Sequence, residues 1–138
     1  MLKKILACLS CCLALTFLWI ASSISLFSRY SSETEVYLEK NNSCATITKV
    51  ENNSLPFQFY KYGEACEVDK SQFDLEKTLR EFDAKVLWTE DTESGKSYYA
   101  YAPKMRYSCQ LKGKKINLHL FVGRDKVKMA SPLVFGSY

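Results

Sequence analysis

The residue types that most often act in catalysis are few in this chain. The single histidine is His119, and three cysteines, Cys44, Cys66 and Cys109, lie beyond the hydrophobic amino-terminal segment. A nucleophilic cysteine needs a base within hydrogen-bond reach, so Cys66 or Cys109 with His119 would be the pair of a thiol- or His-dependent hydrolase. No local motif supports that pair, and the plain interpretation of His119 is a surface or sheet-facing residue. We therefore predict that the protein is not an enzyme and keep the hydrolase as an alternative.

Metal and cofactor chemistry also lack the residue patterns that they need. No His, Cys or carboxylate cluster has metal-ligand spacing, and no glycine-rich phosphate loop occurs. Glu90 and Asp91 fall in a turn-rich stretch, where carboxylates are normally solvated, so they do not indicate a glycosidase pair. We predict no metal site and no cofactor. Cys66 and Cys109 form the candidate disulfide, with three buried thiols as the alternative.

Positive charge gathers toward the carboxyl end of the chain. Residues 96–138 contain nine basic residues and one acidic residue, whereas residues 33–95 contain fourteen acidic and seven basic ones. The net charge of +4 conceals this division. Lysines in the second part predict a basic surface for an acidic protein or a polyanionic envelope partner, although they would also serve as the solvent face of a sheet. These lysines are Lys112, Lys114, Lys115, Lys126 and Lys128.

The closing stretch, residues 114–138, is typical of a β-hairpin around a Gly-Arg-Asp corner. Aliphatic residues alternate with another set, as in a strand with two different faces. After the corner, Lys126 and Lys128 are expected to face solvent while Val127 and Met129 face inward. The aliphatic set is Ile116, Leu118, Leu120 and Val122, and the opposite set is Asn117, His119 and Phe121.

A helix is predicted over residues 71–86. Ser71 and Asp74 form a capping pair at its start, and acidic residues crowd its early turns. Apolar residues recur at helical spacing along one face, which predicts packing against a sheet. That stripe is Leu75, Leu79, Phe82 and Val86.

The other predicted elements are strands. Two β-favouring runs at 35–40 and 44–50 predict a hairpin, and residues 56–63 alternate like a strand. After the helix, further strands are expected at 86–90 and 97–103, followed by the terminal hairpin. The predicted fold class is therefore α+β, with one helix packed on an antiparallel sheet in the order β-α-β-β-β-β.

The amino terminus carries an export segment. Residues 5–27 contain no charge and follow Lys3 and Lys4, which is the arrangement that keeps the amino terminus in the cytoplasm. The run approaches the roughly 20 residues that span a bilayer, so an anchored chain, single-pass with its amino terminus cytoplasmic, is one prediction. Cleavage after Ser23 or Ser25 and secretion is the other. Either way the cell membrane is a predicted partner, and export argues against nucleic acid.

Three regions follow from these patterns. Residues 1–28 are a signal peptide or membrane anchor, residues 29–55 a polar linker or hairpin, and residues 56–138 the extracytoplasmic α+β domain. We expect this small domain to bind another envelope component, with a structural or immunity-type envelope protein as a further alternative.

The carboxyl-terminal part resembles one known family. The stretch GKKINLHLFVGRDKVKMASPLVFGSY, preceded by YYAYAP, is similar to the closing part of the YwmB-like exported proteins of Gram-positive spore-forming bacteria. The similarity covers residues 58–138, including the Ser131-Pro132-Leu133-Val134 close. It implies an exported α+β domain with the strand order given above, and it implies no catalytic residues. This chain departs from the family pattern in its shorter length, its tighter terminal hairpin and its three external cysteines.

Overall fold

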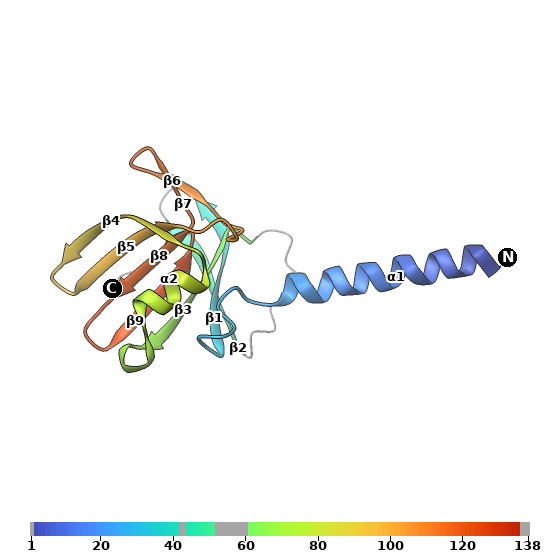
Figure 1. Cartoon of the computed structure of the whole chain (residues 1–138), viewed down its shortest axis with the longest axis horizontal. Coiled ribbons are helices and arrows are strands. Elements are labelled where there is room, and N and C mark those ends of the chain that lie inside the picture. Colours follow the sequence, from blue (N-terminus) through green and yellow to red (C-terminus); the bar gives the residue numbers. More distant parts are fainter. Residues whose placement is uncertain (1, 42–43, 52–60, 136–138) are drawn as a thin grey trace.

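The computed structural model describes residues 2–41, 44–51 and 61–135. Figure 1 shows a long helix projecting from a domain that contains the other elements. The helices are α1 (Leu2–Ser23), the 3-10 helix η1 (Lys70–Gln72) and α2 (Leu75–Glu81). The strands are β1 (Glu33–Asn41), β2 (Cys44–Glu51), β3 (Gly63–Asp69), β4 (Lys85–Thr92), β5 (Gly95–Tyr101), β6 (Cys109–Leu111), β7 (Lys114–Ile116), β8 (Leu118–Val122) and β9 (Lys126–Ser131).

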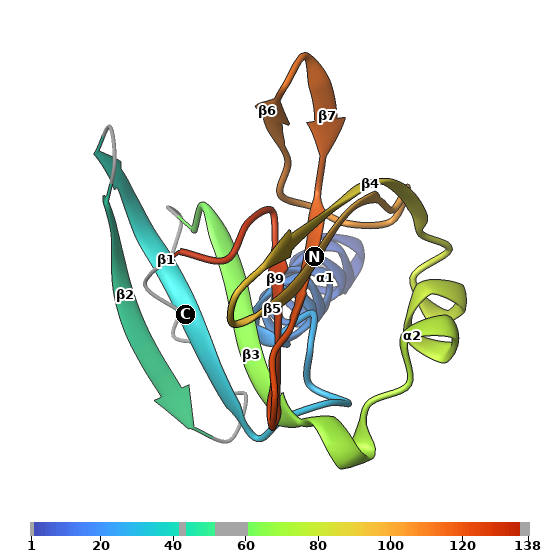
Figure 2. The same cartoon turned by 90° about the vertical axis from the view of Figure 1, so that its left-hand side faces the viewer.

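Most strands join in one antiparallel sheet. The sheet has seven strands in the order β2-β1-β3-β9-β8-β5-β4, and β6 and β7 form a separate two-stranded sheet. Figure 2 shows the β6–β7 hairpin standing above the larger sheet and α2 on one side of it. The prediction of a mixed domain with an antiparallel sheet is confirmed. The predicted order of elements is not confirmed, since the β1–β2 and β6–β7 hairpins are added to it.

The main core lies between α2 and one face of the large sheet, which we call the helix face. Its central rows come from β8 and β9, where Leu120 pairs with Met129 and Val122 pairs with Val127. Burial of these apolar side chains is the main force that holds α2 against the sheet. The buried members are Phe27, Cys66, Val68, Ala100, Ala102, Met105, Leu118, Leu120, Val127 and Met129.

The opposite face of the sheet, which carries Ala65, His119 and Ala130, is also covered. After β9 the chain turns back over this face, so we call it the tail face. The Val134 N–H donates to His119 Nδ1 at 3.1 Å, and the Phe135 ring meets the Tyr37 ring edge-on at 4.9 Å. The second set of alternating residues, opposite the aliphatic set, is therefore shielded from solvent as well. Those residues are all buried: Asn117, His119 and Phe121.

The helix is shorter than the pattern predicted. Asp74 alone caps it, because its side chain accepts a hydrogen bond from the Lys77 N–H at 3.0 Å. Ser71 lies in η1 and takes no part in the cap. The helix stops at Glu81, and Asp83 adopts a left-handed backbone with φ 52°. Val86, the predicted last member of the apolar stripe, therefore belongs to β4.

The amino-terminal segment passes directly into the domain. α1 ends at Ser23, and Ser25 and Phe27 are already buried in the domain. The predicted boundary at residue 28 thus falls inside a packed segment, and the predicted linker or hairpin at 29–55 contributes β1 and β2 to the large sheet. Among the described residues, no helix combines the length and apolar character that crossing a bilayer requires. Most of the strand predicted at 56–63 lies outside the described residues.

Candidate functional site

The β6–β7 hairpin carries three of the predicted basic residues, Lys112, Lys114 and Lys115. All three are exposed, and a two-residue turn, Lys112–Gly113, joins the strands. Both turn residues have positive φ, 50° for Lys112 and 72° for Gly113, as a type I′ turn requires. Asn, Asp or Gly is the usual first residue of such a turn, so lysine at 112 works against the local backbone preference. We call these three residues the hairpin lysines.

The hairpin lysines lie over aromatic rings of the large sheet. The Nζ atoms of Lys112 and Lys114 are each 5.8 Å from the centre of the Trp88 ring, and Lys115 Nζ is 5.9 Å from that of Tyr101. These distances suit cation–π attraction, which holds the hairpin against β4 and β5. Two ammonium groups therefore lie within cation–π distance of one indole ring.

Glu90 is the one acidic side chain that the structure places in this group. Lys112 donates a hydrogen bond to Glu90 Oε1, and the Tyr99 hydroxyl donates to Oε2 at 3.1 Å. The hydrogen bond from Lys112, followed by that from Tyr99, lowers the pKa of the Glu90 carboxyl. Glu90 therefore stays ionised and partly neutralises Lys112. Within the described residues, no carboxylate lies within ion-pair distance of Lys114 or Lys115.

A stack of three rings supports the lysines from beneath. Trp88 of β4 stacks on Tyr99 of β5 at 4.7 Å and 14°, and Tyr99 stacks on His119 of β8 at 4.4 Å and 11°. These cross-strand contacts fix the ring of Trp88 relative to the sheet. Lys112 and Lys114 therefore rest on a rigid support.

The structure places the other two predicted lysines elsewhere. Lys126 and Lys128 lie on β9, beyond the five residues of β8, which span about 17 Å. Lys126 contacts Asp69 at 2.9 Å and Glu67 at 3.7 Å, and Lys128 contacts Glu35 at 3.5 Å. The hydrogen bond to Asp69 raises the pKa of Lys126. These two residues, the β9 lysines, are thus matched by acidic neighbours from β1 and β3, and the five predicted residues do not form one surface.

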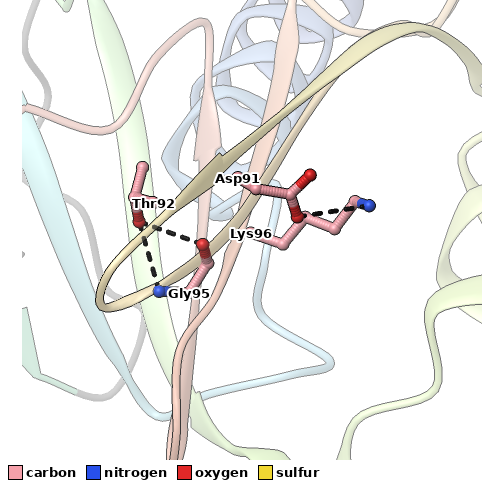
Figure 3. Close-up of polar contacts among 4 residues, drawn as sticks. All are labelled: Asp91, Thr92, Gly95 and Lys96. Atoms are coloured by element: carbon pink, nitrogen blue, oxygen red, sulfur yellow. Dashed lines mark hydrogen bonds and ion pairs between the residues drawn. The ribbon is translucent and has the colours of Figure 1, made fainter.

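Other basic residues also differ in whether an acidic neighbour pairs with them. Lys96 is paired with Asp91 at 3.3 Å beside the β4–β5 turn, which the Thr92 hydroxyl closes through hydrogen bonds with Gly95 (Figure 3). Lys104 and Arg106, which the prediction omitted, are exposed on the connection that leads into β6. Their position in the sequence, next to the predicted strand at 97–103, is the feature that could have added them to the predicted basic surface. Lys104 and Arg106 therefore add positive charge on the chain next to the hairpin lysines.

A hollow with a volume of about 520 Å³ lies at the opposite end of the domain from the β6–β7 hairpin. Phe121 and Gly123 contribute to its wall, together with three basic and three acidic side chains. Because the two signs balance, this hollow has no surplus charge to attract an anion. The charged residues are Arg124, Lys126, Lys128, Glu67, Glu93 and Asp125.

The candidate disulfide between Cys66 and Cys109 is not formed. Cys66 is a free thiol, 2% exposed, and it lies in the core on the helix face. Cys109 begins β6, where it pairs with Ile116 of the separate two-stranded sheet. Burial raises the pKa of the Cys66 thiol, and Glu35 and Glu64 raise it further.

His119 does not meet Cys66 either, because the two side chains lie on opposite faces of the sheet. Cys66 pairs with Met129 on the helix face, and His119 pairs with Ala130 on the tail face. Burial lowers the pKa of His119 to about 4, although the charge of Glu90 opposes this shift. The interpretation of His119 as a surface residue is wrong, since it is 1% exposed. In the part of the chain that the structure describes, no group of three or more His, Cys, Asp or Glu residues is placed to hold a metal ion.

Comparison with known proteins identifies no relative of this chain. No protein-family model matches the chain, and no curated protein or solved structure matches it. The resemblance to the YwmB-like proteins therefore stays a prediction.

Proposed function

We propose that the chain is a small, non-enzymatic extracytoplasmic domain that binds an acidic envelope component through its hairpin lysines. The observation that carries this proposal is Lys112, a lysine in a left-handed turn position, with its ammonium group and that of Lys114 both 5.8 Å from the centre of the Trp88 ring. Backbone strain of this kind is frequent at functional positions. Like charges held together on a rigid support raise the local potential toward an anion.

The direction of the hairpin favours a partner in the surrounding compartment. Its tip points away from α1 in Figure 1. In a chain that keeps α1 in a bilayer, the hairpin lysines would face away from the lipid head groups of that membrane, and in a chain released from α1 nothing holds them to that membrane. An acidic protein or a polyanionic polymer of the envelope suits this orientation better than the membrane surface.

The proposal includes export by the amino-terminal segment, to a location on the cell membrane or outside the cell. It also includes the β-α-β-β-β-β unit that the family resemblance implies. In this chain the unit would consist of β3, α2, β4, β5, β8 and β9, with the β1–β2 and β6–β7 hairpins as additions. The adjacency of β3, β9, β8, β5 and β4 in the sheet supports this division.

Cross-linking in intact cells, followed by mass spectrometry, tests the proposed binding. The full chain is compared with a hairpin variant, Lys112→Asn with Lys114→Gln and Lys115→Gln, and with a β9 variant, Lys126→Gln with Lys128→Gln. Asn suits the turn at 112, so the hairpin variant loses charge without added backbone strain. The hairpin variant should lose an acidic cross-linked partner that the β9 variant keeps.

Salt provides an independent measurement on the recovered complex. Raising the salt from about 0.05 M to about 1 M shortens the range of charge interactions from more than 10 Å to about 3 Å. Recovery of the partner should fall steeply over this interval. Equal recovery at both concentrations, or equal loss in the two lysine variants, would contradict the proposal.

A further inference from the structure

α1 and the folded domain meet at a single exposed residue, Ile24. α1 ends at Ser23, and Ile24 is 54% exposed. The chain is buried from the next residue, since Ser25 is 3% exposed. Phe27 is fully buried and packs edge-on against Phe82 of the α2 end at 5.9 Å. The buried part of the domain therefore begins at Ser25.

The Ser25 hydroxyl lies at the centre of a buried polar group. It donates to Glu64 Oε2 at 3.0 Å and accepts from the Thr34 hydroxyl at 3.0 Å. The Leu26 N–H donates to the same Glu64 oxygen at 2.8 Å, and the Phe27 N–H donates to Ser25 Oγ at 3.2 Å. Glu64 is 2% exposed and Thr34 is 1% exposed. We call Ser25, Leu26, Thr34 and Glu64 the junction cluster.

Small residues at the end of α1 allow two cleavage positions for a signal peptidase. Ala21 and Ser23 suit a cut before Ile24, and Ser23 and Ser25 suit a cut before Leu26. The two products would differ in the junction cluster. A cut before Leu26 would remove the Ser25 hydroxyl, which accepts from the Thr34 hydroxyl and from the Phe27 N–H in a buried site. A cut before Ile24 would leave every contact of the cluster in place.

We infer that a signal peptidase hydrolyses the Ser23–Ile24 peptide bond and releases the complete domain from α1. This inference rests on the proposed export. Water adds across the bond, so Ser23 keeps a carboxylate on the α1 fragment and Ile24 gains an α-ammonium group on the domain. The new charge lies on an exposed residue, where water solvates it.

The composition of α1 gives a second reason for separation at this bond. Its apolar side chains are largely exposed, with Leu13 at 68% and Phe17 at 72%. Apolar surface of this extent favours a bilayer over water. Hydrolysis after Ser23 removes all of α1 and no residue of the packed domain.

The mass of the mature protein tests the inference. The full chain is expressed in bacterial cells, and the membrane and extracytoplasmic fractions are measured by intact mass and by sequencing the amino-terminal peptide. The expected mature chain begins at Ile24. A mature chain that begins at Leu26 or elsewhere, or that retains α1 outside the cytoplasm, overturns the inference while leaving export intact. A full-length chain confined to the cytoplasm contradicts the proposed export itself.

Matched substitutions at the end of α1 sharpen the test. Ser23→Leu puts a bulky residue next to the cleaved bond, where a small one is required. Ser22→Leu makes the same change one residue earlier, where the requirement for a small residue does not apply. Ser23→Leu should keep α1 in most of the chains, and Ser22→Leu should be processed like the unchanged protein. Equal processing of the two variants overturns the inference.

Discussion

The carboxylate of Glu64 lies 3.0 Å from the Ser25 hydroxyl oxygen, although 39 positions separate the two residues in the chain. This contact ties the segment after α1 to β3, in the middle of the domain. Both residues are almost fully buried, so water cannot take the place of either hydrogen-bonding partner. The segment that the sequence assigned to the export signal is therefore in part a structural element of the domain.

Replacing Ser25 by alanine should destabilise the domain. The Thr34 hydroxyl and the Phe27 N–H lose their acceptor, and Glu64 loses a donor. Unsatisfied buried groups cost about 1–3 kcal/mol each, so we expect the free energy of unfolding to fall by at least about 1 kcal/mol. Urea unfolding followed by circular dichroism measures it.

Ser28→Ala is the matched control for this prediction, because Ser28 is exposed three residues further on. It should change the free energy of unfolding by less than about 0.5 kcal/mol. Equal effects of the two substitutions would show that the junction cluster does not stabilise the domain.

Local patterns in the sequence were sufficient for much of the fold. The run at 35–40 and the run at 44–50 form the β1–β2 hairpin, the segment at 86–90 falls within β4, and the segment at 97–103 overlaps β5, which ends at Tyr101. These are short-range features, which depend on side-chain alternation and turn residues.

The features that the sequence did not reveal depend on distant contacts. His119 has the position of a solvent-facing residue in its strand, and only the return of the chain at Val134 buries it. Asn117 stands between β7 and β8 because its side chain bonds both the N–H and the C=O of Ala102, each at 2.6 Å. The five lysines form one cluster along the sequence, but β8 separates them in space. Pattern analysis of one strand carries no information on such contacts.

Gly63 should not tolerate a side chain. A Cβ atom at this position would lie 2.4 Å from the Ser131 carbonyl oxygen and 2.8 Å from the Tyr37 ring. Both neighbours are buried, so Gly63→Ala forces backbone to move, and overpacking of this kind costs roughly 1–3 kcal/mol. Thermal unfolding should show a clear fall in the midpoint.

Gly113→Ala tests whether the loss of stability in Gly63→Ala comes from the close contacts at Gly63. A Cβ atom at 113 meets no atom within 4 Å, and the substitution opposes only the positive φ of 72° in the β6–β7 turn. Its effect should stay in the hairpin and leave the main unfolding transition near that of the unchanged protein. A larger loss for Gly113→Ala than for Gly63→Ala would contradict this account.

Cys66 should resist alkylation in the native protein. Its thiol is buried, and the raised pKa keeps it protonated at pH 8, whereas the thiolate is the reactive form. Peptide mapping after iodoacetamide treatment should show Cys66 unmodified in the absence of urea and modified above the unfolding midpoint. Rapid labelling of Cys66 in the native protein, or its recovery in a peptide linked to Cys109, would disprove the placement of Cys66 as a buried free thiol in the core.

Acid should destabilise the domain through His119. Its pKa is lowered from 6.5 to about 4 in the folded protein, mainly by burial. Above about pH 6.5 the imidazole is neutral in both the folded and the unfolded chain, so it contributes no pH dependence. Between about pH 6.5 and pH 4 the unfolded chain binds a proton that the folded chain does not, so the free energy of unfolding falls as the pH falls. Each unit of pKa difference corresponds to about 1.4 kcal/mol, so the free energy of unfolding should fall by at most about 3 kcal/mol by pH 4.

Nuclear magnetic resonance can follow this group directly, because His119 is the single histidine of the chain. Its ring-proton shifts should stay at the neutral value through pH 5 and move only as the pH approaches 4, where protonation also breaks the hydrogen bond from the Val134 N–H to Nδ1. His119→Gln retains a side-chain acceptor but no titrating group, so its free energy of unfolding should depend less on pH between 6.5 and 4. The carboxylates titrate in both proteins, and the difference between them isolates the histidine. A midpoint near 6.5 in the folded protein would mean that His119 is solvated, and the tail would then not cover this face of the sheet.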